Sequence, residues 1–477
     1  MRTLVMLFFF GVALMIRCYP QVASIPGVAS AIEVAAATPV SVMLTSYSTT
    51  LPANGKAHTR LRIAVVDSLN REITPATDSI RLYITGDGKV TAADGSLPVM
   101  RTDTAGKAYA ACRLVHGCCH LVFVAGTSPG KVGVEARSGK LWPGSHEIHT
   151  LPAGFVSMKP RPGQLPPTTK TIGRMIGADI SFLHEIEARG RKFYDNGQEK
   201  DAVTLLRDHG FNYIRLRIFV NPENEKGYSP GKGYCGLGHT MEMARRIRQA
   251  GMKLLLDFHY SDYWADPQQQ NKPQAWEGLD FKTLQDSVKA YTSRVLLALR
   301  LQGTMPAMVQ IGNEINHGIL WPDGHISKPD QLAALLKAGI AGVEAVDPSI
   351  PVMMHLALGG QHDESVFWLD NMIARGVRFD IIGLSYYPRW HGTLDDLKNN
   401  LADLEKCYNK PVNVVEYSDF RREVHEIVFN IPGEMGKGAC IWEPLGWGNG
   451  LFDKNGSATD LLGVYDELSE KYLRNVE

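Results

Sequence analysis

The 477-residue sequence lacks an excess of charge of either sign. Lys and Arg total 50, and Asp and Glu also total 50, so the formal net charge at pH 7 is zero. Without a basic or acidic excess, no field draws the chain toward nucleic acid or an anionic membrane surface. We therefore predict no nucleic acid partner, and the charge balance fits a neutral substrate.

The sequence also lacks an apolar run that spans a bilayer comfortably. The run at residues 4–16 follows Arg2 and has the length of a signal-peptide core, so residues 1–23 are predicted to be a signal peptide. We expect export, either secretion or retention in the cell envelope, in the periplasm or at the cell surface. Processing just before Cys18 would add a lipid and an outer-membrane attachment, but Arg17 favours ordinary cleavage nearby, since small residues precede lipidated cysteines.

Cysteine is scarce and shows no metal-binding spacing. The seven cysteines are far apart except for Cys118 and Cys119, and none lies in a CxxC or zinc-type pattern. Export permits a disulfide from Cys112 to Cys118 or Cys119, and free buried thiols are the alternative. His259 has no HxH or HExxH partner, so no metal site is predicted.

Two domains are expected, because a chain of this length with 44% hydrophobic residues can form more than one core. Short alternating runs separated by Gly- and Asn-containing turns predict an all-β sandwich over residues 38–152. Its segment 102–108, Thr-Asp-Thr-Ala-Gly-Lys-Ala, is similar to bacterial immunoglobulin-like modules. Residues 153–171 contain four prolines between 160 and 167, which predicts a semi-rigid linker.

Residues 172–477 alternate short apolar runs with amphipathic stretches, the pattern of βα units. Eight such units in about 300 residues predict a (β/α)₈ barrel, so the fold class is α/β with a TIM barrel after the sandwich. A doubly wound sheet is the competing architecture, but no GxGxxG motif follows the first strand and no phosphate loop is present. The expected strands are 175–180, 213–219, 253–258, 307–312, 351–356, 381–385, 412–415 and 439–442, with helices including 199–209, 281–301, 328–345 and 393–408.

Two predicted strands, the fourth and the seventh, are followed by glutamate. Glu314 comes after Gly312 and Asn313, and Glu416 directly follows residues 412–415. Chemistry in a barrel collects at the C-terminal strand ends, so these carboxyl groups are expected to face each other across the barrel mouth. Glycosidic hydrolysis needs one protonated carboxyl and one ionised carboxylate, and this pair can supply both.

Other predicted strand ends carry polar and aromatic residues. Arg215 and Arg217 alternate with apolar residues and should face one side of their strand, where either one holds the nucleophile ionised or forms a buried ion pair. Aromatic residues in the loops favour a sugar groove, since aromatic faces stack on the apolar faces of sugars. Further strand-end and loop candidates are Asp179, Asp257, His259, His355, Tyr386, Tyr260, Tyr263, Trp264, Trp276, Trp321, Tyr387, Trp390, Trp442 and Trp447.

Four motifs resemble glycoside hydrolase family 53, the endo-β-1,4-galactanases. They are Gly-Ala-Asp-Ile-Ser (177–181), the run from Tyr to Pro at 213–222, Leu-Asp-Phe-His-Tyr-Ser-Asp-Tyr-Trp-Ala-Asp-Pro (256–267) and Ile-Gly-Asn-Glu-Ile (311–315). Support comes from residues 320–322, 385–388, 414–416 and 442–444. The match runs in order from Arg174 to the end of the chain, and is far more specific than one Asn-Glu pair.

The resemblance implies a retaining double displacement on β-1,4-galactan. Glu314 would be the acid/base, Glu416 the nucleophile, and Asn313 a ligand of the sugar 2-hydroxyl. It implies that Arg215 and Tyr386 hold Glu416. The remaining implied substrate-binding residues are Trp442, which floors the subsite beside the cut, and Asp179, His259, Trp264 and His355, which line the groove.

The sequence departs from the family in two loops. Few residues separate Glu416 from a helix expected near Arg421, and the segment 442–453 is brief, whereas family members often have long loops there. Some bacterial members hold calcium around these loops, but no acidic cluster stands here, so no cofactor is predicted. A barrel glycanase acting on β-mannan or β-glucan and a non-catalytic carbohydrate-binding or adhesion protein remain alternatives.

Overall fold

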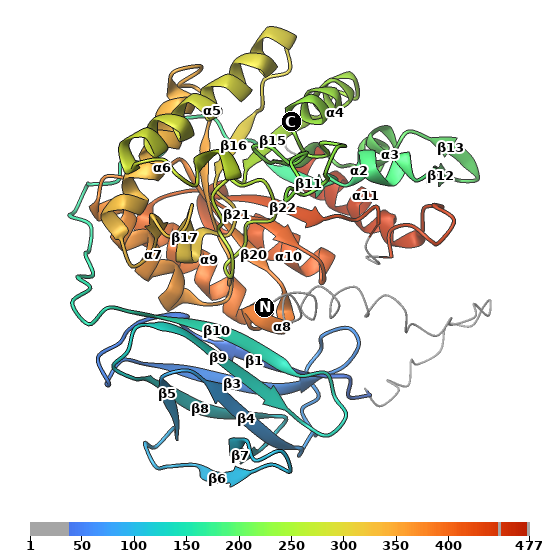
Figure 1. Ribbon diagram of the computed structural model, residues 1–477. Helices are drawn as coiled ribbons and strands as arrows, with labels where there is room; N and C mark the ends of the chain where they lie inside the picture. The colour runs from blue at the N-terminus through green and yellow to red at the C-terminus, as the bar shows by residue number, and fades with distance from the viewer. Residues whose placement is uncertain (1–37, 447–449, 475–477) are drawn as a thin grey trace, which may run out of the picture.

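The structure is a computed structural model that describes residues 38–446 and 450–474 (Figure 1). The expected signal peptide and Cys18 lie outside these ranges. Within them, no helix is both long and apolar enough to cross a membrane. Figure 1 shows two bodies, a small β domain and a larger barrel above it.

The first domain is a sandwich of two sheets, so the predicted all-β architecture of this region is confirmed. Alternate residues of its strands face inward, among them the fully buried Leu61, Ile63 and Phe123. Cys112 and Cys119 are free thiols whose Sγ atoms lie 2.6 Å apart. One sheet has the order β1 (Ser41–Ser46), β3 (His58–Val66), β8 (Cys118–Ala125), β5 (Gly88–Ala92); the other has β2 (Thr50–Pro52), β10 (Gly144–Leu151), β9 (Gly130–Arg137), β4 (Ser79–Thr85), β7 (Ala108–Arg113), β6 (Val99–Thr102).

The second domain contains a closed barrel of eight parallel strands, which confirms the predicted (β/α)₈ fold. The barrel order is β11 (Met175–Asp179), β14 (Tyr213–Ile218), β15 (Lys253–Phe258), β16 (Met308–Ile311), β19 (Val352–Leu356), β20 (Ile381–Tyr386), β21 (Val412–Tyr417), β22 (Gly436–Trp442). Two small hairpins are β12 (Phe193–Asp195) with β13 (Gln198–Lys200), and β17 (Gly318–Ile319) with β18 (Gly324–His325).

The barrel helices fall close to their predicted positions. Strong end signals place them: Asp280 caps the start of the longest helix through the backbone N–H groups of the next turn, and Gly303 at φ 76° ends it. The helix expected from residue 199 begins at Ala202, because Gln198–Lys200 form β13 and Asp201 is the N-cap. The α-helices are α2 (Leu183–Ala188), α3 (Ala202–Asp208), α4 (Leu237–Gln249), α5 (Phe281–Gln302), α6 (Pro329–Glu344), α7 (His362–Ala374), α8 (Pro388–His391), α9 (Leu394–Tyr408), α10 (Arg421–Phe429) and α11 (Gly463–Ser469); the shorter helical turns are η2 (Gln274–Trp276), η3 (Ile315–His317), η4 (Pro432–Glu434), η5 (Asp460–Leu462) and η6 (Glu470–Arg474).

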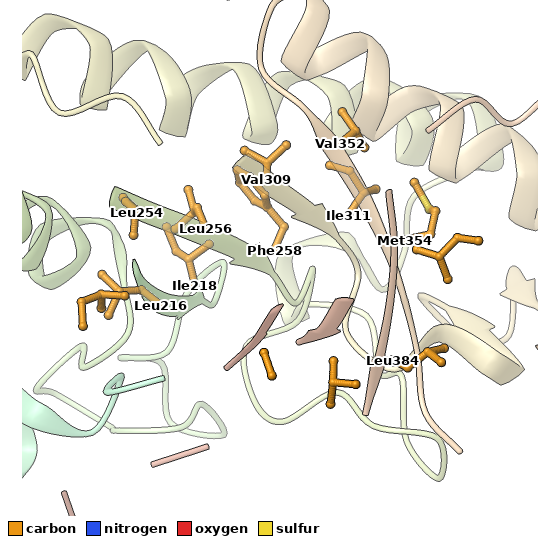
Figure 2. Packing of buried hydrophobic residues seen from close by; sticks show 14 of the residues in the cluster. Leu216, Ile218, Leu254, Leu256, Phe258, Val309, Ile311, Val352, Met354 and Leu384 are labelled. Carbon is orange, nitrogen blue, oxygen red and sulfur yellow. The ribbon is translucent and has the colours of Figure 1, made fainter. Parts of the chain in front are cut away.

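Strand alternation divides the barrel residues into an outer apolar set and an inner set. The outer set packs beneath the helices and includes Leu216, Leu256, Val309 and Met354 (Figure 2). The intervening inner residues form an apolar layer at the N-terminal end of the strands: Met175, Tyr213, Leu255, Met308, Met353, Ile381, Val415 and Cys440. One pleat further along, four of these strands carry a buried polar residue: Arg215, Asp257, Gln310 and His355. The polar inner residues therefore lie directly above the apolar inner layer, toward the C-terminal ends of the strands.

The sandwich docks on the barrel through a buried carboxylate. Glu364 of α7 is fully buried, and its carboxylate accepts hydrogen bonds from the sandwich segment before and within β2. The donors are the backbone N–H groups of Thr49 (2.8 Å) and Thr50 (3.1 Å) and the hydroxyls of Ser48 (3.1 Å) and Thr50 (2.9 Å). A carboxylate that takes all these donors from the other domain fixes the two domains against each other.

Replacing Glu364 by alanine is expected to lower the melting temperature, because buried donors of the sandwich lose their acceptor. The loss corresponds to about 3 kcal/mol. Differential scanning calorimetry of the full chain measures it. Glu364→Gln keeps one acceptor oxygen and should cost less, and Asp363→Ala, at the exposed neighbouring position, should cost nothing measurable. An unchanged melting temperature for Glu364→Ala would show that the interface does not depend on this carboxylate.

Candidate active site

Glu314 stands on a tight turn at the end of β16. Gly312 has φ 84°, and a Cβ there would meet the Ile315 side chain at 2.5 Å, so this close approach requires glycine. Glu314 itself is left-handed, with φ 48° and ψ 55°. A non-glycine residue in this region is held by its surroundings against local strain, as is common at functional sites. The turn aims the half-buried Glu314 side chain over the polar inner layer.

Glu416 reaches the same place through an irregularity in β21. Gly383 of β20 is paired with Asn413, but Ser385 is paired with Glu416, so β21 contains one extra residue between these pairs. Val415 already lies in the inner apolar layer, and regular alternation would turn Glu416 outward. The bulge brings Glu416 to the inner face as well, where it is 8% exposed.

Arg215 connects the inner polar residues. Its guanidinium donates to Glu416 Oε2 (2.9 Å), Asp179 Oδ2 (2.9 Å), Asp257 Oδ2 (2.8 Å) and Asn313 Oδ1 (2.8 Å). Burial lowers the pKa of Arg215, but the surrounding carboxylates more than offset this and raise it, so the side chain stays charged. Arg215 thus holds the Glu416 carboxylate in place and favours its ionised form.

A second chain of hydrogen bonds ends on Glu314. The Glu314 backbone N–H donates to Nδ1 of His355 (3.3 Å), which leaves the proton of the neutral ring on Nε2. Nε2 lies 2.8 Å from the Ser385 hydroxyl, and that hydroxyl donates to Glu314 Oε1 at 2.6 Å. Burial, followed by the Arg215 charge, holds the pKa of His355 well below its ordinary value, so the ring remains neutral.

The two carboxyl groups differ in how readily they ionise. Burial and the neighbouring Glu416 carboxylate raise the pKa of Glu314 well above its ordinary value, although the Ser385 hydroxyl and the Arg215 charge favour its ionised form. Burial also raises the pKa of Glu416, but Arg215 and the Tyr387 hydroxyl favour its charged form. The first proton taken up by the pair therefore belongs on Glu314. This is the division between an acid and a carboxylate that glycosidic hydrolysis requires.

The predicted role of Tyr386 is wrong, and Tyr387 takes it. The Tyr387 hydroxyl donates to Glu416 Oε1 at 2.6 Å. Tyr386 is fully buried on the outer side of β20, where its hydroxyl donates to the Gly392 carbonyl at 3.1 Å. Strand alternation explains the difference, since Ser385 faces inward, Tyr386 faces outward, and Tyr387 returns to the side on which Glu416 lies.

Replacing Tyr387 by phenylalanine is expected to move the acidic limb of the pH–activity profile to higher pH. Its hydroxyl stabilises the ionised Glu416, so its loss raises the pKa of that carboxyl and lowers kcat about tenfold. Tyr386→Phe removes the same atom one residue away and should leave the limb unmoved. Equal profiles for both variants would reject this role of Tyr387.

Three further predicted residues are buried inside the barrel and not exposed at its mouth. Asp179 and His355 are fully buried, and His259 is 3% exposed with its Nε2 3.0 Å from Asp257 Oδ2. They contact Arg215, Ser385 or Asp257, so they support the residues above them. The expectation that they line the groove is therefore corrected: these side chains are buried inside the barrel and contact the residues that hold the two glutamates.

Trp264 and Trp442 do lie together at half-buried positions, with ring centroids 6.4 Å apart. Phe182 packs against both, at 5.8 and 6.3 Å. The guanidinium of Arg217 lies over Phe182 (4.2 Å) and Trp264 (4.3 Å) and pairs with the buried Glu443 at 2.7 Å. Of the two alternatives for Arg217, the ion pair is the one observed, and it supports an aromatic wall.

Sequence reasoning missed two residues of this network. Gln310 is fully buried, accepts from Arg215 Nε (3.3 Å) and donates to Asp257 Oδ1 (2.6 Å). Ser385 donates to Glu314. Both are polar residues inside apolar strands and face inward, as Arg215 and Asp257 do. A polar residue at an inward-facing position of an apolar strand is a pattern from which both could have been predicted.

Comparison with known proteins agrees with this site. The model of Glycosyl hydrolase family 53 matches residues 175–431, which include both glutamates. The chain belongs to glycoside hydrolase family 53. It is therefore a glycoside hydrolase by family, and the predicted family is confirmed.

Relatives and solved structures show how far the likeness extends. A Niallia circulans protein described by its place in the bgaB 5′ region is 41% identical over 312 residues, covering 57% of this chain and 83% of that protein. A probable arabinogalactan endo-β-1,4-galactanase A of Neosartorya fischeri is 33% identical, with 56% and 83% covered. The Ignisphaera aggregans family 53 catalytic domain superposes with a TM-score of 0.59 at 33% identity, covering 65% of this chain and 99% of that one. The family model begins at β11, so the sandwich lies outside the matched residues 175–431.

Proposed function

We propose that the protein is an exported retaining endo-β-1,4-galactanase that cleaves galactan, including type I arabinogalactan of pectin side chains. One observation carries the proposal: Glu314 and Glu416 converge above the Arg215 network and are inequivalent toward protons. The named relatives, among them a Bacillus subtilis endo-β-1,4-galactanase 34% identical over 243 residues, support galactan as the substrate. An intact pair of this kind argues against a purely carbohydrate-binding or adhesion protein.

The geometry supports a two-step reaction. In the first step, a Glu416 oxygen attacks the anomeric carbon, the bond from that carbon to the leaving oxygen breaks, and the Glu314 proton passes to that oxygen. In the second, Glu314 takes a proton from water while the water oxygen displaces Glu416. Asn313 is suited to the sugar 2-hydroxyl, because its Oδ1 is fixed by Arg215 and its Nδ2 by the Ala265 carbonyl at 2.9 Å. Trp264 and Trp442 offer faces on which a galactose ring can stack.

The sandwich is, in this proposal, part of the catalytic unit rather than a detached spacer. His149 stacks on His317 with centroids 3.6 Å apart, and His317 follows Glu314 by three residues. The Thr49 hydroxyl lies 3.3 Å from the same ring. The turn that carries the acid is thus held from the sandwich side, and the Glu364 variants test whether this docking is firm. Its kinship with bacterial immunoglobulin-like modules, and the boundaries 38–152 and 153–171, remain predictions.

A substrate panel tests the assignment of galactan. Purified full-length protein is incubated with β-1,4-galactan, β-mannan and β-glucan, and the released sugars are followed over time by chromatography. We expect galactan alone to be cut efficiently, with a mixture of oligosaccharides appearing early, as internal cleavage produces. Preferential cleavage of mannan or glucan would replace galactan as the substrate, and early release of a single short product would indicate cleavage from a chain end.

A further inference from the structure

Three metal-ligating side chains meet on the outside of the barrel, apart from the glutamate pair. His184 lies on α2, and His239 and Glu242 lie three residues apart on one face of α4. One ligand atom from each can be chosen so that all three lie within 4.8 Å of one another. Two imidazoles and one carboxylate are a donor set that first-row transition metals prefer.

The hydrogen bonds of the two rings indicate that the facing Nδ1 atoms of His184 and His239 do not both carry a hydrogen. His239 Nε2 lies 3.1 Å from the Lys232 carbonyl, so that nitrogen carries the hydrogen and Nδ1 of the neutral ring presents a lone pair. His239 Nδ1 and His184 Nδ1 are 2.9 Å apart. Two lone pairs at this distance repel, so either one shared proton or one cation must lie between them.

A second observation favours the cation. His184 Nε2 is buried, and within the described ranges it has no hydrogen-bond partner; Glu242 Oε1 is the facing acid, at 3.8 Å. If Nδ1 of His184 carries the shared proton, the Nε2 lone pair faces the negative charge of the Glu242 carboxylate at 3.8 Å. If Nδ1 gives its lone pair to a metal instead, Nε2 carries the hydrogen and the carboxylate can turn onto the ion. The metal-bound arrangement removes the contact between the lone pair and the negative charge.

We propose that His184, His239 and Glu242 bind one divalent transition-metal ion, with zinc as the first candidate. Zinc–nitrogen bonds of about 2.0–2.1 Å in a tetrahedron separate two ligand nitrogens by about 3.3 Å, a few tenths of an ångström more than observed. Glu242 is 60% exposed and free to rotate onto the ion, and water completes the set. The Lys232 carbonyl is the outer partner that orients His239.

The ion ties two barrel helices together beside the aromatic wall. α2 begins one residue after Phe182, which packs on Trp264 and Trp442. An ion that joins α2 to α4 stabilises the loop that carries Phe182, so its removal should lower thermal stability and weaken substrate binding before it affects the chemical step. The site itself does not depend on the substrate assigned above.

Isothermal titration calorimetry with zinc chloride tests the site on full-length protein that has been treated with a chelator and then freed of it. We expect about one zinc per chain for the wild type and loss of this binding in His184→Ala and in His239→Ala. His209→Ala is the matched control, because His209 also lies beside two carboxylates, Asp195 at 3.6 Å and Asp466 at 2.9 Å, but among the described residues only the His184 cluster brings three ligand atoms within 4.8 Å of one another. It should bind zinc as the wild type does.

Thermal unfolding gives an independent readout. Zinc should raise the melting temperature of the wild type and of His209→Ala by several degrees and leave both cluster variants unmoved. Circular dichroism checks that the variants are folded, and Glu242→Gln, at an exposed position, should weaken zinc binding at least tenfold without unfolding the chain. No zinc uptake by the wild type, or equal uptake by the His184→Ala, His239→Ala double variant, would overturn the proposal.

Discussion

Replacing Glu416 by glutamine is expected to lower kcat on galactan by about four orders of magnitude. The change keeps the size of the side chain and its contact with Tyr387 but removes the negative charge that Arg215 holds at 2.9 Å. Without that charge, no galactosyl-enzyme bond forms and the sugar cation loses its stabilising neighbour. Initial rates of reducing-sugar release at saturating galactan measure the effect.

The control for this variant is Glu423→Gln on α10, an exposed glutamate seven residues further along the chain. It makes the same chemical change on a neighbouring element and should retain wild-type kcat. Melting temperatures of both variants establish that neither is unfolded. Galactan hydrolysis by Glu416→Gln within tenfold of the wild type would remove Glu416 from the mechanism.

The sequence predicted most of the scaffold because its periodicity is strong. Arg215 and Arg217 were expected on one face from their alternation with apolar residues, and both are buried on the inner face. The fourth and seventh strands were expected to end at the two glutamates, and β16 and β21 do occupy these places in the barrel. The alternation of apolar residues and the order of the strands along the chain can both be read from the sequence without knowing how the elements pack.

The position of Glu416 depends on a feature that periodicity does not contain. Regular alternation from the outer Val414 through the inner Val415 would send Glu416 outward, and only the extra residue in β21 returns it to the groove. A bulge is set by pairing with both neighbouring strands, so sequence spacing alone does not reveal it. Tyr386 was predicted in place of Tyr387 for a similar reason. The two residues are consecutive and point to opposite sides, so an error of one position exchanges their roles.

The docking of the sandwich also lay beyond sequence reasoning. The prolines predicted only that residues 153–171 form a semi-rigid linker. In the structure Gln164 in it donates to the Ile373 carbonyl of α7 at 2.7 Å, and Met158 N–H donates to Asn371 Oδ1 at 3.0 Å. Glu364 is an ordinary helix residue until its partners in the other domain are known. These contacts join residues more than 200 positions apart, and contacts at such a separation do not appear as a periodic pattern in the sequence of either part.

Replacing Glu314 by glutamine is expected to lower kcat on galactan about 10³-fold, while an activated aryl β-galactoside should still enter the first step. A sugar hydroxyl needs a proton in order to leave, but a nitrophenolate leaves without one. The second step still needs a base, so the variant should release one equivalent of nitrophenol in a burst and then turn over slowly. Stopped-flow absorbance follows the burst, and intact-protein mass should show one added hexose.

The pH profile gives the same residue a second test. Glu314 must be protonated in the first step, and burial and Glu416 raise its pKa, so wild-type activity should persist above the ordinary glutamate range and fall as pH rises through the raised value. Glutamine cannot lose a proton, so the alkaline limb should vanish in Glu314→Gln while the acidic limb from Glu416 remains. An alkaline limb unchanged in the variant would assign it to another group and leave Glu314 without the role of acid.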